Sequence, residues 1–88
     1  PAPQREKQQR LRFSYKEQRE YASIDGDIAA LEEKIAAVES EMAQKATDYT
    51  ALERLTAEKE ALERQLDEKM ERWVYLNELA EKIAAQKE

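Results

Sequence analysis

Two apolar stripes, one in each half of the chain, constrain the fold more than any other feature. The first stripe spaces its apolar side chains in alternating steps of four and three: Ile24, Ile28, Leu31, Ile35, Val38 and Met42. The second stripe keeps the same spacing and includes two lysines: Leu52, Leu55, Lys59, Leu62, Leu66, Lys69, Trp73 and Leu76. A heptad stripe of this kind is the seam along which two helices pack. We therefore predict two long helices.

The two stripes are out of phase with each other. The first, continued through Leu52, would next require an apolar residue at position 56, but the sequence offers Leu55. The break falls within residues 46–51, where Thr and Asp favour caps and turns over helix interiors. A continuous coiled coil with a local skip fits this pattern, and so does a hairpin. The hairpin is favoured because the stripes are mirror images about residues 48–49, which lie in the turn-prone segment.

The predicted fold is all-α, an antiparallel two-helix coiled-coil hairpin with a short N-terminal helix packed on the overhang of the second long helix. We expect a basic linker at residues 1–10 and a hairpin domain at 11–88. Within the domain we predict a short helix at about 15–23, a long helix at 25–46, a turn at 47–50 and a long helix at 51–86.

Three local features place these boundaries. The short helix should end at Asp25–Gly26, because Gly tolerates positive φ, and Asp25 or Asp27 would then cap the next helix. Asp48 or Thr50 can cap the second long helix. The second predicted helix is longer than the first, and the part that overhangs it, from about residue 70 to 83, has too many apolar residues for a narrow seam. The short helix and the residues before it should therefore cover Trp73.

Composition excludes several classes of site. Ala, Glu, Lys, Leu and Arg make up about 60% of the chain, as in coiled coils and long helices. Gly26 is the single glycine, which excludes a Gly-rich phosphate-binding loop. His and Cys are absent, so His-based catalysis, thiol chemistry and the usual zinc sites are excluded. We expect no catalytic, cofactor-binding or metal-binding residue here, no secretory signal and no membrane segment.

Acidic and basic side chains at i,i+4 spacing should support the exposed helix faces. Four such pairs occur in the favourable order: Glu41 with Lys45, Glu60 with Arg64, Glu68 with Arg72, and Glu78 with Lys82. They carry no evident chemistry.

Charge is strongly polarised along the chain. Residues 1–19 have a net charge of +4 and residues 20–88 a net charge of −9, which together give −5. A basic arm on an acidic body predicts contact with a polyanion at one end only. The candidate nucleic-acid-binding residues are Arg5, Lys7, Arg10, Arg12, Lys16 and Arg19. The alternative is that residues 1–10 are merely a solvated linker.

Two aromatic residues lie among these cations. Tyr15 and Tyr21, interleaved with Arg12, Lys16 and Arg19, resemble the mixture of aromatic and basic side chains used for single-stranded nucleic acid. The alternative is that the aromatic rings pack on the region around Trp73.

The two ends of the predicted hairpin resemble a known family. Residues 11–20, which contain SYKEQRE, resemble the "(K/R)LSYKEQREL" opening of the C-terminal domain of ABC-F ATP-binding cassette proteins of the Uup-like group. Residues 72–79, which begin RWVYL, are similar to its closing "RWEYLEEL". Between these two motifs, the "I..LE..I" stretch that follows the opening in the family matches Ile28, Leu31, Glu32 and Ile35.

The resemblance implies a cytoplasmic parent protein whose ATP-binding cassettes, with their ATP and magnesium, lie upstream of this chain. Because the chain opens with Pro1 rather than Met, we also expect it to be a piece of something larger. The fragment itself would be a non-catalytic accessory module, and we expect it to be monomeric. Its partner would be DNA or ribosomal RNA, bound through the basic end without base readout. Alternatively, it would be a positioning arm that contacts the parent's cassettes or a ribosomal protein.

Overall fold

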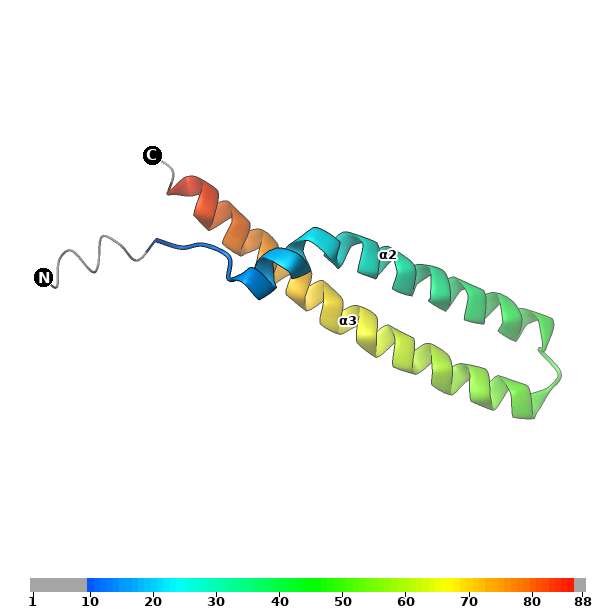
Figure 1. Cartoon of the computed structure of the whole chain (residues 1–88). Helices are drawn as coiled ribbons and strands as arrows, with labels where there is room; N and C mark the ends of the chain where they lie inside the picture. Colours follow the sequence, from blue (N-terminus) through cyan, green and yellow to red (C-terminus); the bar gives the residue numbers. More distant parts are fainter. Residues whose placement is uncertain (1–9, 87–88) are drawn as a thin grey trace, which may run out of the picture.

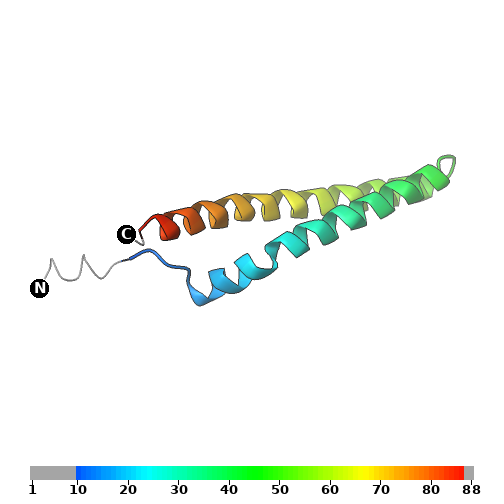
Figure 2. The same ribbon diagram turned by 90° about the horizontal axis from the view of Figure 1, so that it is seen from above.

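The computed structural model describes residues 10–86, which form two helices joined by a short turn (Figure 1). Helix α2 is Tyr15–Gln44 and helix α3 is Tyr49–Ala85. The two helices lie side by side and antiparallel in a rod 71 Å long and 20 by 16 Å across (Figure 2). The described residues contain no strand, and the prediction of an all-α helical hairpin is confirmed.

Each helix begins at a capping residue. The Ser14 side chain accepts a hydrogen bond from the Glu17 backbone N–H at 3.1 Å, while the Glu17 carboxylate accepts one from the Ser14 N–H at 2.9 Å. This reciprocal capping box satisfies two backbone donors at the start of α2. Asp48 caps α3 by accepting from the Ala51 N–H at 3.1 Å, as one of the two candidates predicted. The turn lies at residues 45–48, slightly before its predicted position.

The core is a narrow line of apolar side chains between the helices. Its fully or nearly fully buried members all belong to the two predicted stripes: Ile24, Leu31 and Val38 from α2, and Leu55 and Leu76 from α3. The two lysines of the second stripe reach solvent and pair with acids of α2. Lys59 lies 3.2 Å from Glu39, and Lys69 lies 3.2 Å from Asp27. Their stems therefore cover the seam while their charges remain outside it.

The predicted short helix at 15–23 is wrong as a separate element, because α2 runs without interruption through Asp25 and Gly26. No described residue has positive φ, so Gly26 is an ordinary helical residue here. The carboxylates expected to cap a new helix bond across the hairpin instead. Asp25 accepts from the Trp73 indole N–H at 2.9 Å, and Asp27 accepts from the Lys69 ammonium at 3.2 Å.

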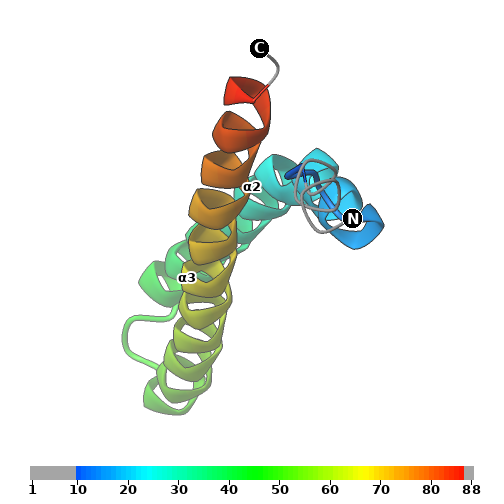
Figure 3. The same ribbon diagram turned by 90° about the vertical axis from the view of Figure 1, so that its left-hand side faces the viewer.

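The end of α3 is covered differently from the prediction. Instead of a three-helix cluster, the segment 10–14 runs beside the last turns of α3, and Leu11 exchanges two hydrogen bonds with the Gln86 side chain. The first turns of α2 lean away from the last turns of α3 (Figure 3). Trp73 consequently keeps 40% of its surface exposed, so the expectation that it would be covered is wrong.

Within residues 10–86, neither helix combines the length and the apolar character that crossing a membrane requires.

Gly26→Ala should raise the free energy of unfolding by about 1 kcal/mol, because Ala is the better helix former and a Cβ at this position meets no atom within 4 Å. Urea unfolding followed by circular dichroism at 222 nm measures the change. A decrease in stability would contradict the continuous helix, since it would indicate that residue 26 needs a backbone conformation that Ala does not tolerate.

Candidate nucleic-acid interface

The two distinctive motifs of the sequence, residues 14–20 and 72–76, meet in space. Arg72 donates two hydrogen bonds to the Glu20 carboxylate, from Nε at 2.8 Å and from Nη2 at 2.7 Å. The Tyr75 hydroxyl donates to Glu17 Oε2 at 2.7 Å, and the Arg72 guanidinium lies over the Tyr75 ring, 4.8 Å from its centroid. These four residues form what we call the polar clamp, which joins the start of α2 to α3.

Hydrogen bonding within the polar clamp shifts the titration of its members. The Ser14 N–H and the Tyr75 hydroxyl lower the pKa of the Glu17 carboxyl. The bonds from Arg72 lower the pKa of Glu20, and in return the Glu20 carboxylate raises the pKa of Arg72. Donation to Glu17 raises the pKa of the Tyr75 hydroxyl. All four groups are therefore held in the protonation states that they have at neutral pH.

The clamp divides the first motif into two helix faces. Ser14, Glu17 and Glu20 recur at three-residue steps; Glu17 and Glu20 bond to α3, and Ser14 bonds to Glu17. Tyr15, Lys16 and Arg19 lie between them in the sequence and are exposed, although Lys16 also borders the hollow that Glu17 and Glu20 line. Tyr15 keeps 74% of its surface exposed, and the Arg19 guanidinium lies 5.7 Å from its ring centroid. The expectation that both tyrosines pack on the Trp73 region is therefore wrong for Tyr15, although Tyr21 stacks on Phe13 with centroids 5.0 Å apart.

The structure places four of the six candidate cations. Arg10, Arg12, Lys16 and Arg19 are exposed at the clamp end of the rod, and none of them forms an ion pair with a described residue. Arg5 and Lys7, with the rest of the predicted linker before residue 10, lie outside the described residues.

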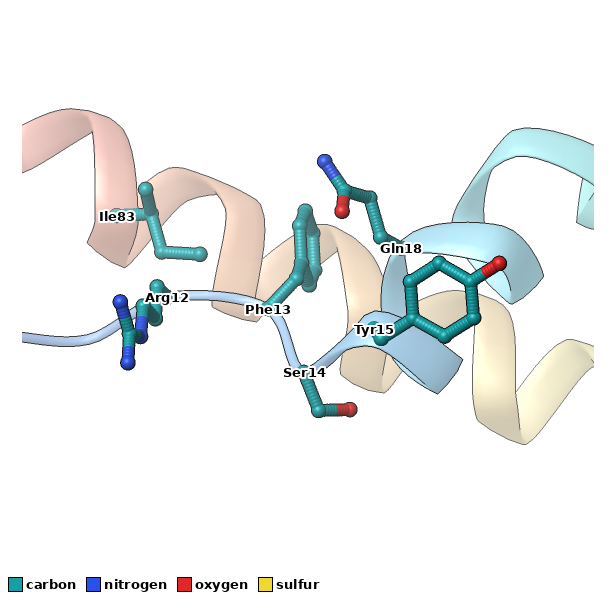
Figure 4. A pocket seen from close by; sticks show the side chains of 6 residues that line it. All are labelled: Arg12, Phe13, Ser14, Tyr15, Gln18 and Ile83. Carbon is teal, nitrogen blue, oxygen red and sulfur yellow. The ribbon is translucent and has the colours of Figure 1, made fainter.

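A groove separates the segment before α2 from the end of α3. It is lined by Arg12, Phe13, Ser14, Tyr15, Gln18 and Ile83 (Figure 4). None of these lining residues is acidic. Two other hollows among the described residues differ in this respect, because one includes Glu17 and Glu20 and the other includes Glu68. Of these three hollows among the described residues, the groove at Tyr15 is therefore the one that best suits an anion.

The described residues offer little for other chemistry. They contain no group of three or more acidic side chains placed to hold a metal ion. The helix N-terminus at Ser14 is closed by its own capping box, so anion binding at this end would depend on side chains.

Sequence reasoning missed the partners of Arg72 and Tyr75. The i,i+4 rule pairs Arg72 with Glu68, whereas the structure pairs it with Glu20. Of the four predicted i,i+4 pairs, the described structure contains Glu41–Lys45, at 3.3 Å. The signal that pointed to the true partners was the mirror register of the two stripes, which brings residues near 20 opposite residues near 75.

Comparison with known proteins identifies related sequences. Residues 12–78 match the family model of the ABC transporter C-terminal domain. Over 77 residues, the chain is 34% identical to the uncharacterized ABC transporter ATP-binding protein YfmR of Bacillus subtilis strain 168. The aligned part is 88% of this chain and 12% of that relative, so the chain spans a small fraction of the relative's length. No solved structure matches the chain.

Glu20→Gln should lower the free energy of unfolding at pH 7 by about 1 kcal/mol, since it replaces a charge-assisted pair that is partly exposed to solvent. Because the pKa of Glu20 is lower in the folded state, its contribution is complete above its ordinary pKa of about 4.3 and disappears as the pH falls through the folded value. Thermal unfolding of both proteins between pH 7 and pH 2.5 measures this. A difference in stability between the two proteins that persists at pH 2.5 would contradict the role given to the carboxylate. The matched control is Glu33→Gln, because Glu33 forms no ion pair with a described residue.

Proposed function

The chain belongs to the ABC transporter C-terminal domain family, and on that premise we propose that it binds nucleic acid weakly and without sequence specificity through its basic end. It is an accessory C-terminal domain of an ABC ATP-binding protein and contains no ATP-binding cassette. The observation that carries the proposal is the group of exposed cations Arg12, Lys16 and Arg19, none of which forms an ion pair with a described carboxylate. Arg12 also lines the groove that has no acidic residue.

Phosphate contacts account for the expected mode of binding. Cations that already pair with a carboxylate gain little from a phosphate, and Lys59, Lys69 and Arg72 are occupied in this way. The unpaired cations at the clamp end keep their charge available for phosphate oxygens. Such contacts position a protein on nucleic acid but carry no sequence information. Arg5, Lys7 and Arg10 extend the same proposal along the preceding residues.

The charge of the rest of the chain limits how the module docks. Residues 20–88 carry a net charge of −9, so the long shaft of the hairpin repels a phosphate backbone. Nucleic acid would therefore meet the clamp end, while the turn at residues 45–48 points away from it.

The whole protein is part of the same proposal. We place it in the cytoplasm as a member of the ABC-F group, Uup-like, with ATP and magnesium bound by cassettes upstream of this chain. Its nucleic-acid target is DNA or ribosomal RNA, and binding of the 88-residue chain to duplex DNA, branched DNA and ribosomes at matched salt concentrations separates these targets.

Neutralising the exposed cations together, as Arg12→Gln, Lys16→Gln and Arg19→Gln in one variant, should weaken duplex binding and reduce its salt dependence. The slope of log K against log salt is negative, and each lost phosphate contact reduces its magnitude by about 0.9. The magnitude should therefore fall by up to about 2.7 in the triple variant. Fluorescence anisotropy with a labelled duplex, titrated at several salt concentrations, measures both quantities.

A second triple variant controls for net charge. Lys34→Gln, Arg54→Gln and Arg64→Gln change the same residue types by the same charge, but along the acidic shaft. This variant should bind like the wild-type chain. Equal loss in both variants, or no binding by the wild-type chain at tens of micromolar in low salt, would refute the proposed function.

A second candidate function is a positioning arm held against the parent's own cassettes. Its support is an apolar strip on α3, where Met70, Trp73 and Val74 are 45%, 40% and 46% exposed at spacings that share one helix face. Leu11 and Gln86 bond to each other, so both ends of the described chain lie at the same end of the rod (Figure 1). The strip lies on α3 about three turns before that end. A domain joined to either end could reach the strip by packing along the last turns of α3.

Trp73, the single tryptophan of the chain, reports directly on this second candidate. In the full-length protein, with its other tryptophans replaced by Phe, acrylamide should quench Trp73 less than in the isolated hairpin, because the cassettes cover the strip. The matched control moves the probe to the turn, as Trp73→Phe with Tyr49→Trp, where quenching should be equal in both proteins. Equal quenching of Trp73 itself would exclude this docking.

A further inference from the structure

We propose that the groove at the start of α2 takes an unpaired base of single-stranded nucleic acid, with the base stacked on the ring of Tyr15. This inference rests on the proposed function and makes it more specific, since it names a strand whose bases are free to stack. Its basis is one exposed aromatic ring, the acid-free lining beside it, and the cations on either side.

Tyr15 differs from the other aromatic residues at this end of the rod because its one ring contact is with a cation of its own helix, Arg19, and not with α3 or another aromatic ring. Phe13 and Tyr21 stack on each other, Trp73 donates to Asp25, and Tyr75 donates to Glu17. Tyr15 keeps 74% of its surface exposed and makes no hydrogen bond to a described residue. An exposed aromatic ring in a basic setting is the feature on which bases stack in single-strand-binding proteins.

The groove around Tyr15 has the size and the chemistry for a nucleotide. Its volume is about 560 Å³, within the range of small-ligand sites. Figure 4 shows Tyr15 and Gln18 at one end of the groove and Arg12 with Ile83 at the other, with Phe13 between them. A ring for stacking, an amide for the edge of a base and a guanidinium for phosphate therefore share one lining.

One cation before Tyr15 in the sequence and one after it lie near its ring. Arg19 lies over the Tyr15 ring at 5.7 Å, and Arg12 lines the groove ahead of it. A strand with a base on Tyr15 would bring its neighbouring phosphates toward these two guanidinium groups. The carboxylates of the same motif do not oppose this, because Glu17 and Glu20 are occupied by Tyr75 and Arg72 on the other face of the helix.

A paired duplex offers no free base face along its length, so stacking on Tyr15 distinguishes single strands from duplexes. We therefore expect Tyr15→Ala to weaken binding of a labelled 12-nucleotide oligo(dT) or oligo(U) by about 5-fold to 150-fold, the range found for loss of one stacked base. Binding of a 12-base-pair duplex should change less than 2-fold. The DNA and RNA strands separate the two possible sources of the ligand, and loss with either one supports the proposal.

The chain supplies a closely matched control. Tyr49 is also the first residue of its helix after the capping residue and is 82% exposed, but it lies at the opposite end of the rod. Tyr49→Ala should leave single-strand binding unchanged. Tyr15→Phe keeps the ring and should restore wild-type affinity. Circular dichroism of each variant checks that the helices are intact.

The outcomes separate this inference from the proposed function. If Tyr15→Ala binds single strands like the wild-type chain while the Arg12, Lys16 and Arg19 variant still loses affinity, stacking is refuted and phosphate binding stands. Equal losses for Tyr15→Ala and Tyr49→Ala, or for single strand and duplex, would also overturn the stacking proposal. If the wild-type chain binds neither nucleic acid, both proposals fail.

Discussion

The antiparallel register of the two apolar stripes is the constraint on which every other contact depends. Ile24, Leu31 and Val38 are buried against α3, and Leu55 and Leu76 against α2, so the most deeply buried apolar residues all belong to the two stripes and select this alignment. A shift of one helical turn would place seam residues in solvent and separate the two terminal motifs. With the observed register, Glu20 lies opposite Arg72 and Glu17 opposite Tyr75. Apolar burial therefore supplies the stability, and the polar clamp fixes the geometry at the end where the candidate interface lies.

Helical periodicity separates the residues of segment 14–20 that hold the hairpin together from those that stay exposed. Side chains at three-residue steps point to the same side, so the residues that cap and clamp the helix share one face. The remaining residues, Tyr15, Lys16, Gln18 and Arg19, are exposed to solvent. A single short segment can thus hold the hairpin together and still present an aromatic ring and two cations. This explains why a distinctive motif carries both a structural and a candidate binding role without the two competing.

The parts of this arrangement that sequence reasoning reached are the ones governed by periodicity. The seam, the turn region, the cap at Asp48 and the solvent-reaching lysines 59 and 69 all follow from spacing and from residue chemistry. The errors concern residues whose behaviour depends on a partner far away in the sequence. Gly26 looked like a helix end, but the seam continues on both sides of it, and the cost of about 1 kcal/mol for a helical glycine is small beside that packing.

Trp73 and Tyr15 are two further residues whose exposure could not be predicted from the sequence. A large apolar ring on the overhang of a helix suggests burial, but the indole finds a hydrogen bond to Asp25 near the surface and stays partly exposed. Tyr15 was expected to help cover that overhang, yet at the start of α2 it keeps 74% of its surface exposed. The bonds from Glu17 and Glu20 to α3 fix which side of the first turns of α2 faces the hairpin, and they leave Tyr15 and Arg19 exposed to solvent. Because the rest of the chain is acidic, a polyanion would be repelled everywhere but at this end.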